Sequence, residues 1–173
     1  MRFSLLSSFV LVIASGFSVA AHARSIVETQ QSTAYDLPDG WSVLRWDEKT
    51  GEATLKNGKT GDFLKVERYG LAGEPTSYPN SEEVASGRTL TWKYTEDLGP
   101  ILPGSRLNGE VRLTETAIIR IVVWPPIAVA ISMIDKEAGL AAMRSISASV
   151  KILGPRKCWP PGECPPGEVK TVK

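Results

Sequence analysis

Histidine is nearly absent from this sequence of 173 residues: the single copy is His22, close to the N-terminus. It lies in a segment that has the pattern of a removable leader, so we expect the processed chain to contain no histidine. Such a chain cannot build Ser-His-Asp or Cys-His catalytic arrangements, histidine metal sites or imidazole acid–base chemistry.

Other common catalytic patterns are missing as well. The sequence has no calcium-loop pattern, no phosphate-cradling glycine motif and no nucleophile elbow. We therefore expect a protein that is not an enzyme and has no catalytic residues, no metal site and no cofactor. A hydrolase that uses a carboxylate pair, as some glycosidases do, is the catalytic alternative that these absences leave open.

Cysteine is scarce, and both copies, Cys158 and Cys164, lie near the C-terminus. In an exported protein two neighbouring cysteines favour a local disulfide. Their spacing differs from the C-x-x-C pattern of redox pairs, and two cysteines without histidine make a poor metal site. We predict a disulfide between Cys158 and Cys164 that closes a small loop and contributes about 2 kcal/mol there, with little effect on the core.

The sequence also lacks an excess of charge of one sign. Lys and Arg number 20 and Asp and Glu 19, for a formal net charge of +1. The expected leader contains Arg2 and no acidic residue, so the processed chain would be neutral. A neutral chain without a basic block gives no electrostatic reason to bind nucleic acid or an anionic membrane, and we expect neither as a partner.

The N-terminal residues have the three parts of a secretory signal peptide. Arg2 supplies the positive charge, residues 5–20 are mostly apolar or small, and Ala21-His22-Ala23 has the form of a cleavage site. We predict a signal peptide at 1–23 with cleavage between Ala23 and Arg24, and a periplasmic or secreted location. An uncleaved anchor is the alternative, but the apolar core is short for a membrane span.

Residues 117–134 hold the densest run of β-branched apolar residues outside the leader. A membrane helix is disfavoured because Arg120 lies inside the run, two prolines divide it, and Ile and Val favour strands. We predict two strands, 117–124 and 127–134, joined at Trp124-Pro125-Pro126, and no membrane span in the processed chain.

Short strand patterns separated by Gly- and Pro-containing turns fill most of the remaining chain, which is typical of antiparallel sheets. Residues 24–33 are polar and are expected to form a loose lead-in, and 81–85 a single helical turn. Asn57-Gly58 and Asn108-Gly109 are expected to form tight turns. The remaining strands are predicted at 34–37, 41–46, 52–56, 62–69, 88–95 and 110–115, the three from 41 to 69 forming a meander.

The only long helical pattern is residues 136–149, with Asp135 as its N-cap. Leu140, Met143 and Ile146 share one face, and the alanines of this segment favour close packing on the small-residue face of 127–134. The fold class predicted from these patterns is α+β: an antiparallel sheet of six to eight strands with one long C-terminal helix packed on a face. The domain would span 24–153, followed by a proline-rich, extended or disordered tail at 154–173.

Three residues are candidate partner contacts: Trp124 at the end of the central strand, Arg120 within it, and Tyr78 in the loop 70–80. Trp, Tyr and Arg are enriched in binding hot spots. For Trp124 the alternative is a stack against the following prolines. For Arg120 the alternatives are a contact with the anion of a ligand and a salt bridge with Glu110 or Glu115 on the preceding strand.

The segment Tyr35-Asp-Leu-Pro-Asp-Gly-Trp41 and the ending Arg144-Ser-Ile-Ser-Ala-Ser-Val150 resemble the opening and ending of the PsbP-like superfamily. The resemblance covers about residues 34–152. It implies an antiparallel sheet flanked by helices and a non-enzymatic role in binding or assembly. It carries over no functional residue to this chain.

From these features we expect an exported, non-enzymatic protein that binds a protein partner through the loops 70–80 and 96–107 or an exposed sheet face. An envelope assembly factor or a toxin-neutralising immunity protein would fit. The alternative is a carrier or sensor of small apolar ligands, with the Trp-rich sheet as one wall of its pocket.

Overall fold

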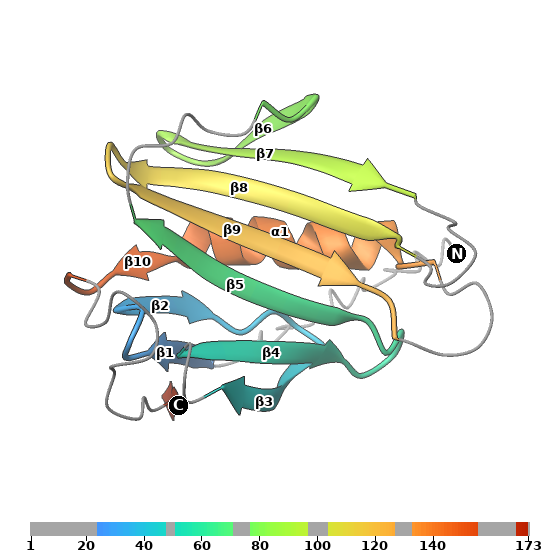
Figure 1. Cartoon of the computed structure of the whole chain (residues 1–173), viewed down its shortest axis with the longest axis horizontal. Coiled ribbons are helices and arrows are strands. Elements are labelled where there is room, and N and C mark those ends of the chain that lie inside the picture. Colours follow the sequence, from blue (N-terminus) through green and yellow to red (C-terminus); the bar gives the residue numbers. More distant parts are fainter. Residues whose placement is uncertain are drawn as a thin grey trace, which may run out of the picture.

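The computed structural model describes residues 24–47, 51–70, 77–96, 104–126, 133–155 and 169–172. In this part of the chain eleven strands and one helix form two layers (Figure 1). Every strand pair is antiparallel. The protein is therefore α+β, as predicted. Among the helices of these segments, none has the length and apolar character that crossing a membrane requires.

The larger sheet has seven strands in the order β3-β4-β5-β9-β8-β7-β6. The first three form the predicted meander, after which the chain crosses to the far edge and returns strand by strand, so that β9 lies beside β5. The bounds are β3 (Trp41–Asp47), β4 (Glu52–Asn57), β5 (Phe63–Gly70), β6 (Asn80–Ala85), β7 (Arg88–Thr95), β8 (Arg106–Thr114) and β9 (Ala117–Trp124).

A second, smaller sheet was not predicted. Its order is β10-β2-β1-β11, with β1 (Ser25–Glu28), β2 (Thr33–Asp36), β10 (Lys151–Ile152) and β11 (Val169–Val172). The predicted count of six to eight strands therefore fits the larger sheet alone. The smaller sheet and helix α1 (Lys136–Ser149) together form the second layer, which covers one face of the larger sheet (Figure 1).

Helix α1 has the predicted bounds. The Asp135 side chain accepts a 3.1 Å hydrogen bond from the backbone N–H of Ala138, which confirms the predicted N-cap. Leu140, Met143 and Ile146 are buried as predicted. The helix has 14 residues and is followed by β10 and β11, so it is not the last element of the chain.

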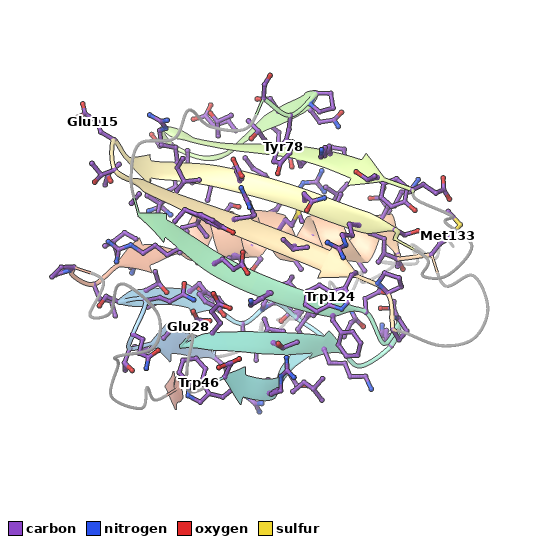
Figure 2. All side chains as sticks on the ribbon, in the orientation of Figure 1. Glu28, Trp46, Tyr78, Glu115, Trp124 and Met133 are labelled. Atoms are coloured by element: carbon purple, nitrogen blue, oxygen red, sulfur yellow. The ribbon has the colours of Figure 1, made fainter. Side chains whose placement is uncertain are left out.

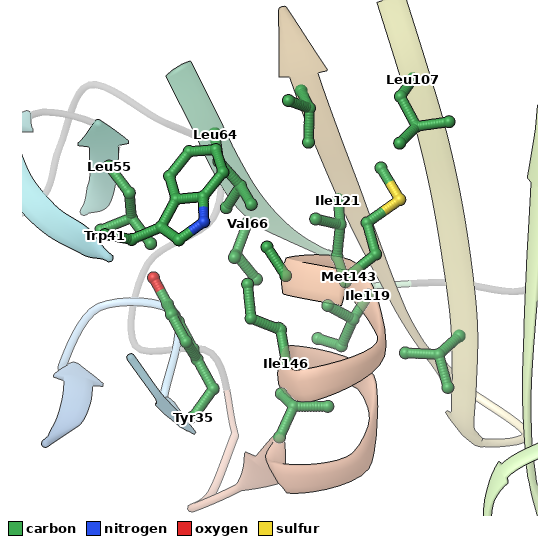
Figure 3. Packing of buried hydrophobic residues seen from close by; sticks show 14 of the residues in the cluster. Tyr35, Trp41, Leu55, Leu64, Val66, Leu107, Ile119, Ile121, Met143 and Ile146 are labelled. Atoms are coloured by element: carbon green, nitrogen blue, oxygen red, sulfur yellow. The ribbon is translucent and has the colours of Figure 1, made fainter. Parts of the chain in front are cut away.

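The core lies between the two layers (Figure 3). Alternate residues of the central strands, such as Ile119 and Ile121 of β9, point towards Met143 and Ile146 of the helix. Tyr35 of β2 fills the part of the core beneath the smaller sheet, beside Trp41 and Leu55 (Figure 3). Burial of about twenty apolar side chains in one cluster holds the two layers together.

Strand β9 has the predicted bounds, and its residues alternate strictly between buried and half-buried. The second predicted strand, 127–134, lies mostly outside the described residues, which exclude 127–132. The two residues that are described, Met133 and Ile134, are not in a strand. Packing of the helix on that strand therefore stays a prediction.

Two segments differ from prediction because distant strands pair with them. Residues 25–28 form strand β1 instead of a loose lead-in, since β2 and β11 hydrogen-bond to its two edges. Residues 80–85 form strand β6 instead of a helical turn, since they pair with β7 across a hairpin. Gly87 in that hairpin has a φ of +71°, a backbone conformation that glycine adopts without steric cost.

Asn108-Gly109, predicted as a turn, lies inside strand β8. Gly109 is opposite Ile121 and faces the helix, where an added Cβ would lie 2.9 Å from the Met143 sulfur. The glycine therefore permits close approach of the helix. Asn57-Gly58 does lie at the turn between β4 and β5, but the positive φ of this turn belongs to Gly61.

The structure describes residues 154–155 and 169–172 of the proline-rich tail, and in the second of these ranges β11 pairs in register with β1 (Ser25 opposite Val172, Glu28 opposite Val169). Cys158 and Cys164 lie outside the described residues, and so does Ala23. Their predicted disulfide and the predicted cleavage site stay predictions. Arg24 is exposed and directly precedes β1.

Candidate functional site

The face of the larger sheet that points away from the helix is here called the outer face. It carries two of the predicted partner contacts, Arg120 and Trp124, and the third, Tyr78, lines a hollow of the same face. Figure 2 looks onto this side and labels Tyr78 and Trp124. Apart from Glu52 of β4 and Glu110 of β8, its side chains are half-buried or exposed. On the four strands β5, β9, β8 and β7 they are Phe63, Lys65, Glu67 and Tyr69, then Ile118, Arg120, Val122 and Trp124, then Arg106, Asn108, Glu110 and Arg112, and Thr91, Lys93 and Thr95.

Ion pairs and hydrogen bonds connect four strands across this face. Lys65 bridges Glu52 of β4 and Glu67, with 2.8 Å from its Nζ to Glu67 Oε1. The Tyr69 hydroxyl donates to Glu67 at 2.9 Å and accepts from Arg120 Nη1 at 3.0 Å. Burial disfavours the charge on Glu67, but the hydrogen bonds from Lys65 and Tyr69 outweigh it and lower the pKa of Glu67.

Arg120 is held in one place by two neighbours. Its Nε and Nη2 atoms each lie 2.9 Å from Oε1 of Glu110, which confirms Glu110 as the predicted partner. Its guanidinium carbon lies 4.2 Å from the ring centre of Tyr69, within cation–π range. The other candidate, Glu115, lies in the β8–β9 turn. The central cation of the outer face is therefore pre-positioned.

Beside Arg120 the outer face is hollowed. The hollow, here called the basic hollow, has a volume of about 420 Å³, and three of its lining side chains are cationic. Lys93 Nζ lies 5.6 Å from the ring centre of Tyr78. The lining residues are Tyr78, Lys93, Thr95, Gly104, Arg106, Asn108 and Arg120.

The structure brings two of the three predicted contact residues together. Tyr78 and Arg120 line the same hollow. Trp124 lies four residues further along β9, with its ring 5.8 Å from that of Phe63 and tilted by 43°. Lys93 and Arg106 were missed, because only the register of β7 and β9 against β8 places them around the same hollow as Arg120.

A second hollow of about 600 Å³ lies between helix α1 and the segment that joins β2 to β3. Trp41 lines it, as do the small residues on one side of the helix. Two carboxylates, Asp36 and Asp39, and Arg24 supply its charges. The full lining is Arg24, Asp36, Leu37, Pro38, Asp39, Gly40, Trp41, Asn57, Ala138, Ala141, Ala142 and Ser145.

A buried carboxyl group lies at the junction of the two sheets. Glu28 has no solvent exposure, and its Oε1 accepts hydrogen bonds from the Tyr35 hydroxyl at 2.7 Å and from the Ala53 N–H at 3.3 Å. Burial raises the pKa of Glu28 to about 8, against the smaller effect of these hydrogen bonds. Burial also raises the pKa of Tyr35.

Glu28 has a raised pKa and lies near a second carboxylate, that of Glu52, and this pattern is also found in catalytic general acids. A substrate, however, cannot touch Glu28 without separation of the two sheets, because the side chain has no exposed surface. Within the described segments, no group of three or more His, Cys, Asp or Glu residues is placed to hold a metal ion.

Comparison with known proteins adds little. No protein-family model matches the chain, and a search of curated proteins finds no match. Among solved structures, a protein from Bacteroides thetaiotaomicron VPI-5482 is similar over 75% of this chain and 48% of its own, with 7% identity and a TM-score of 0.46. This chain thus spans about half the length of that protein, and a similarity at this level carries no functional information.

Proposed function

We propose that this protein is an exported, non-enzymatic binding protein that holds a protein partner on the outer face of its larger sheet. The observation that carries the proposal is the placement of Tyr78, Arg120 and Trp124 on one face of a rigid sheet. An envelope assembly factor and a toxin-neutralising immunity protein both fit this description. Export rests on the signal-peptide pattern of residues 1–23.

The composition of the outer face supports binding of a protein. Half-buried Ile118, Val122 and Trp124 run along β9. Arginine and tyrosine stand beside them, and these residue types are enriched where interfaces bind most strongly. The charges at the centre are already paired, so that a partner would not have to desolvate isolated ions there.

The size of the face also suits a protein. The strands have six to nine residues. Seven such strands, spaced by about 4.8 Å, span roughly 30 Å by 25 Å. A standard interface buries about 800 Å² on each partner, which this face can supply. The resemblance to the PsbP-like superfamily supports the same non-enzymatic role.

The test is affinity capture from an envelope extract with the chain from Arg24 to Lys173 as bait. The expected result is one stoichiometric protein partner that is retained at high salt. Hydrogen exchange of the resulting complex is then expected to show protection in β8 and β9, whose outer side chains the partner would cover.

Two matched variants each introduce an aspartate, one on the outer face at β9 and one, as the control, on β3. Val122→Asp alters a half-buried residue of the outer face, and Leu44→Asp alters an exposed residue of β3. We expect Val122→Asp to lose the partner and Leu44→Asp to keep it, with both proteins folded by circular dichroism. Equal capture by both variants, or no stoichiometric partner for the wild type, would refute the proposal.

The second candidate function is binding of a small, largely apolar ligand. The observation that favours it is the hollow of about 600 Å³ beside helix α1, in which Trp41 faces alanines of the helix. A screen of apolar compounds by tryptophan fluorescence tests it, with Trp41→Phe as the variant that should lose the signal. A response that persists in Trp41→Phe would assign the effect to another tryptophan and exclude this hollow.

A further inference from the structure

We propose that the basic hollow holds the carboxylate side chain of an acidic segment on the protein partner. This inference rests on the proposed function and adds the chemistry of the contact. Its geometry comes from three neighbouring strands, which place Lys93, Arg106 and Arg120 around one depression of the outer face.

The charges of the hollow are unbalanced. Its lining contains three cations and no carboxylate. Within the described part of the chain, Lys93 and Arg106 form no ion pair, and both side chains are exposed. Two cations in this state attract an anion without breaking an existing ion pair.

Arg120 adds directed donors at the inner wall. A guanidinium carries five N–H groups. The contacts to Glu110 and Tyr69 use three of them, one on each nitrogen. Because these contacts fix the plane of the guanidinium, the remaining donors have a fixed direction, and binding a carboxylate there costs little side-chain entropy.

The strand register brings the donors within reach of one carboxylate. Lys93 is opposite Asn108 on β8, and Arg106 is two residues from Asn108 on the same side of that strand. Diagonal neighbours of this kind are about 7–8 Å apart at their Cα atoms. Long Lys and Arg side chains can therefore both reach a carboxylate placed over Asn108, whose amide N–H groups are further donors for an acid.

The surroundings favour a single carboxylate of a protein over an extended polyanion. Next to the hollow on the outer face, Glu52 and Glu67 pair with Lys65, and Glu110 pairs with Arg120, so carboxylates border the hollow. A polyanion would place further negative charges over these glutamates. Along β9 the hollow adjoins half-buried Ile118 and Val122, which suit apolar side chains next to an acidic residue in a peptide.

The experiment uses two capped five-residue peptides as probes, Glu-Leu-Glu-Leu-Glu and its Gln-Leu-Gln-Leu-Gln counterpart, titrated into the isotope-labelled chain from Arg24 to Lys173. NMR shift changes report both the site and the dissociation constant. We expect the glutamate peptide to shift amides of β7 and β8 around the hollow and the glutamine peptide to have little effect.

The decisive variant is Lys93→Gln combined with Arg106→Gln. Its matched control is Arg45→Gln combined with Lys56→Gln, which removes the same charge from exposed positions on β3 and β4. We expect the first variant to weaken binding of the glutamate peptide by roughly tenfold or more and the control by less than about twofold. Equal weakening by both variants, or unchanged binding in the first, overturns the inference.

A short heparin fragment serves as the polyanion probe. If it binds more tightly than the glutamate peptide and depends equally on Lys93 and Arg106, the hollow is a polyanion site and the carboxylate assignment is wrong.

Partner capture separates this inference from the proposed function. If the partner captured through the outer face is lost in Val122→Asp but kept in the Lys93→Gln, Arg106→Gln variant, the proposed function stands and this inference fails. If binding of the glutamate peptide depends on Lys93 and Arg106 but no partner is captured, the proposed function fails and the assignment of the hollow as a carboxylate site stands.

Discussion

The hydroxyl of Tyr35 donates a 2.7 Å hydrogen bond to Oε1 of Glu28, and neither side chain has significant solvent exposure. The two residues lie on neighbouring strands of the smaller sheet, and the carboxyl of Glu28 also accepts from the backbone of β4 in the larger sheet. One ionisable group is thus enclosed where the sheets meet. Its protonation is therefore linked to the stability of the whole fold.

We predict that Glu28 makes the protein less stable as the pH rises. The pKa of Glu28 is raised from 4.5 to about 8, so between these values the folded chain keeps a proton that the unfolded chain releases. The stabilisation is complete below pH 4.5 and is lost as the pH rises through 8. Urea unfolding of the wild type at pH 5, 7 and 9 should show a decreasing free energy of unfolding.

Glu28→Gln should remove this dependence, because the amide oxygen can still accept from Tyr35 and cannot ionise. We expect a flatter profile between pH 5 and 9 and, at pH 9, a more stable protein by a few kcal/mol at most, since each pKa unit corresponds to about 1.4 kcal/mol. Glu115→Gln, an exposed change in the β8–β9 turn, is the control. Parallel profiles for wild type and Glu28→Gln would contradict the prediction.

Replacing Arg120 should destabilise the protein through Glu110. Glu110 is 4% exposed, and Arg120→Ala removes the cation that balances it. We expect a loss of roughly 2 kcal/mol in the free energy of unfolding. Adding Glu110→Gln to Arg120→Ala should restore part of it, because the buried carboxylate is gone. A double variant less stable than either single variant would disprove this account.

Two glycines with positive φ should respond differently to alanine. Gly51 has a φ of +65°, and a Cβ there would overlap the Gln30 side chain. Gly40 has a φ of +80° but no atom within 4 Å of an added Cβ. We expect Gly40→Ala to cost about 1 kcal/mol from the backbone alone and Gly51→Ala about 1 to 2 kcal/mol more. Thermal unfolding measures both, and equal costs would show that Gln30 moves aside freely.

Removal of the C-terminal residues after Pro155 should promote self-association. The shortened chain lacks β11, so β1 becomes an edge strand whose backbone donors and acceptors lack their partner. Such edges pair with strands of other molecules. Sedimentation velocity should show concentration-dependent association for residues 24–155 and not for 24–173. A shortened chain that stays monomeric would indicate that β11 contributes little to covering this edge.

The elements that were predictable from sequence are those with a complete local pattern. Strands 88–95 and 117–124 and helix 136–149 have the predicted bounds, because alternation, helical periodicity and the Asp135 cap are all properties of neighbouring residues. The Arg120–Glu110 pair was also predictable, since β8 and β9 form a hairpin and are therefore adjacent in space. The predicted disulfide and signal cleavage stay predictions.

The sequence by itself determined the α+β class, the meander, the helix and the Arg120–Glu110 ion pair, because each depends on contacts between residues close in the chain. Only the tertiary structure decided the rest. Ser25–Glu28 became a strand because a segment more than 140 residues later pairs with it, and the Glu28 side chain is buried where this strand meets β4. Likewise, Lys93 and Arg106 line one hollow with Arg120 only through the register of three strands, which no local pattern of side chains specifies.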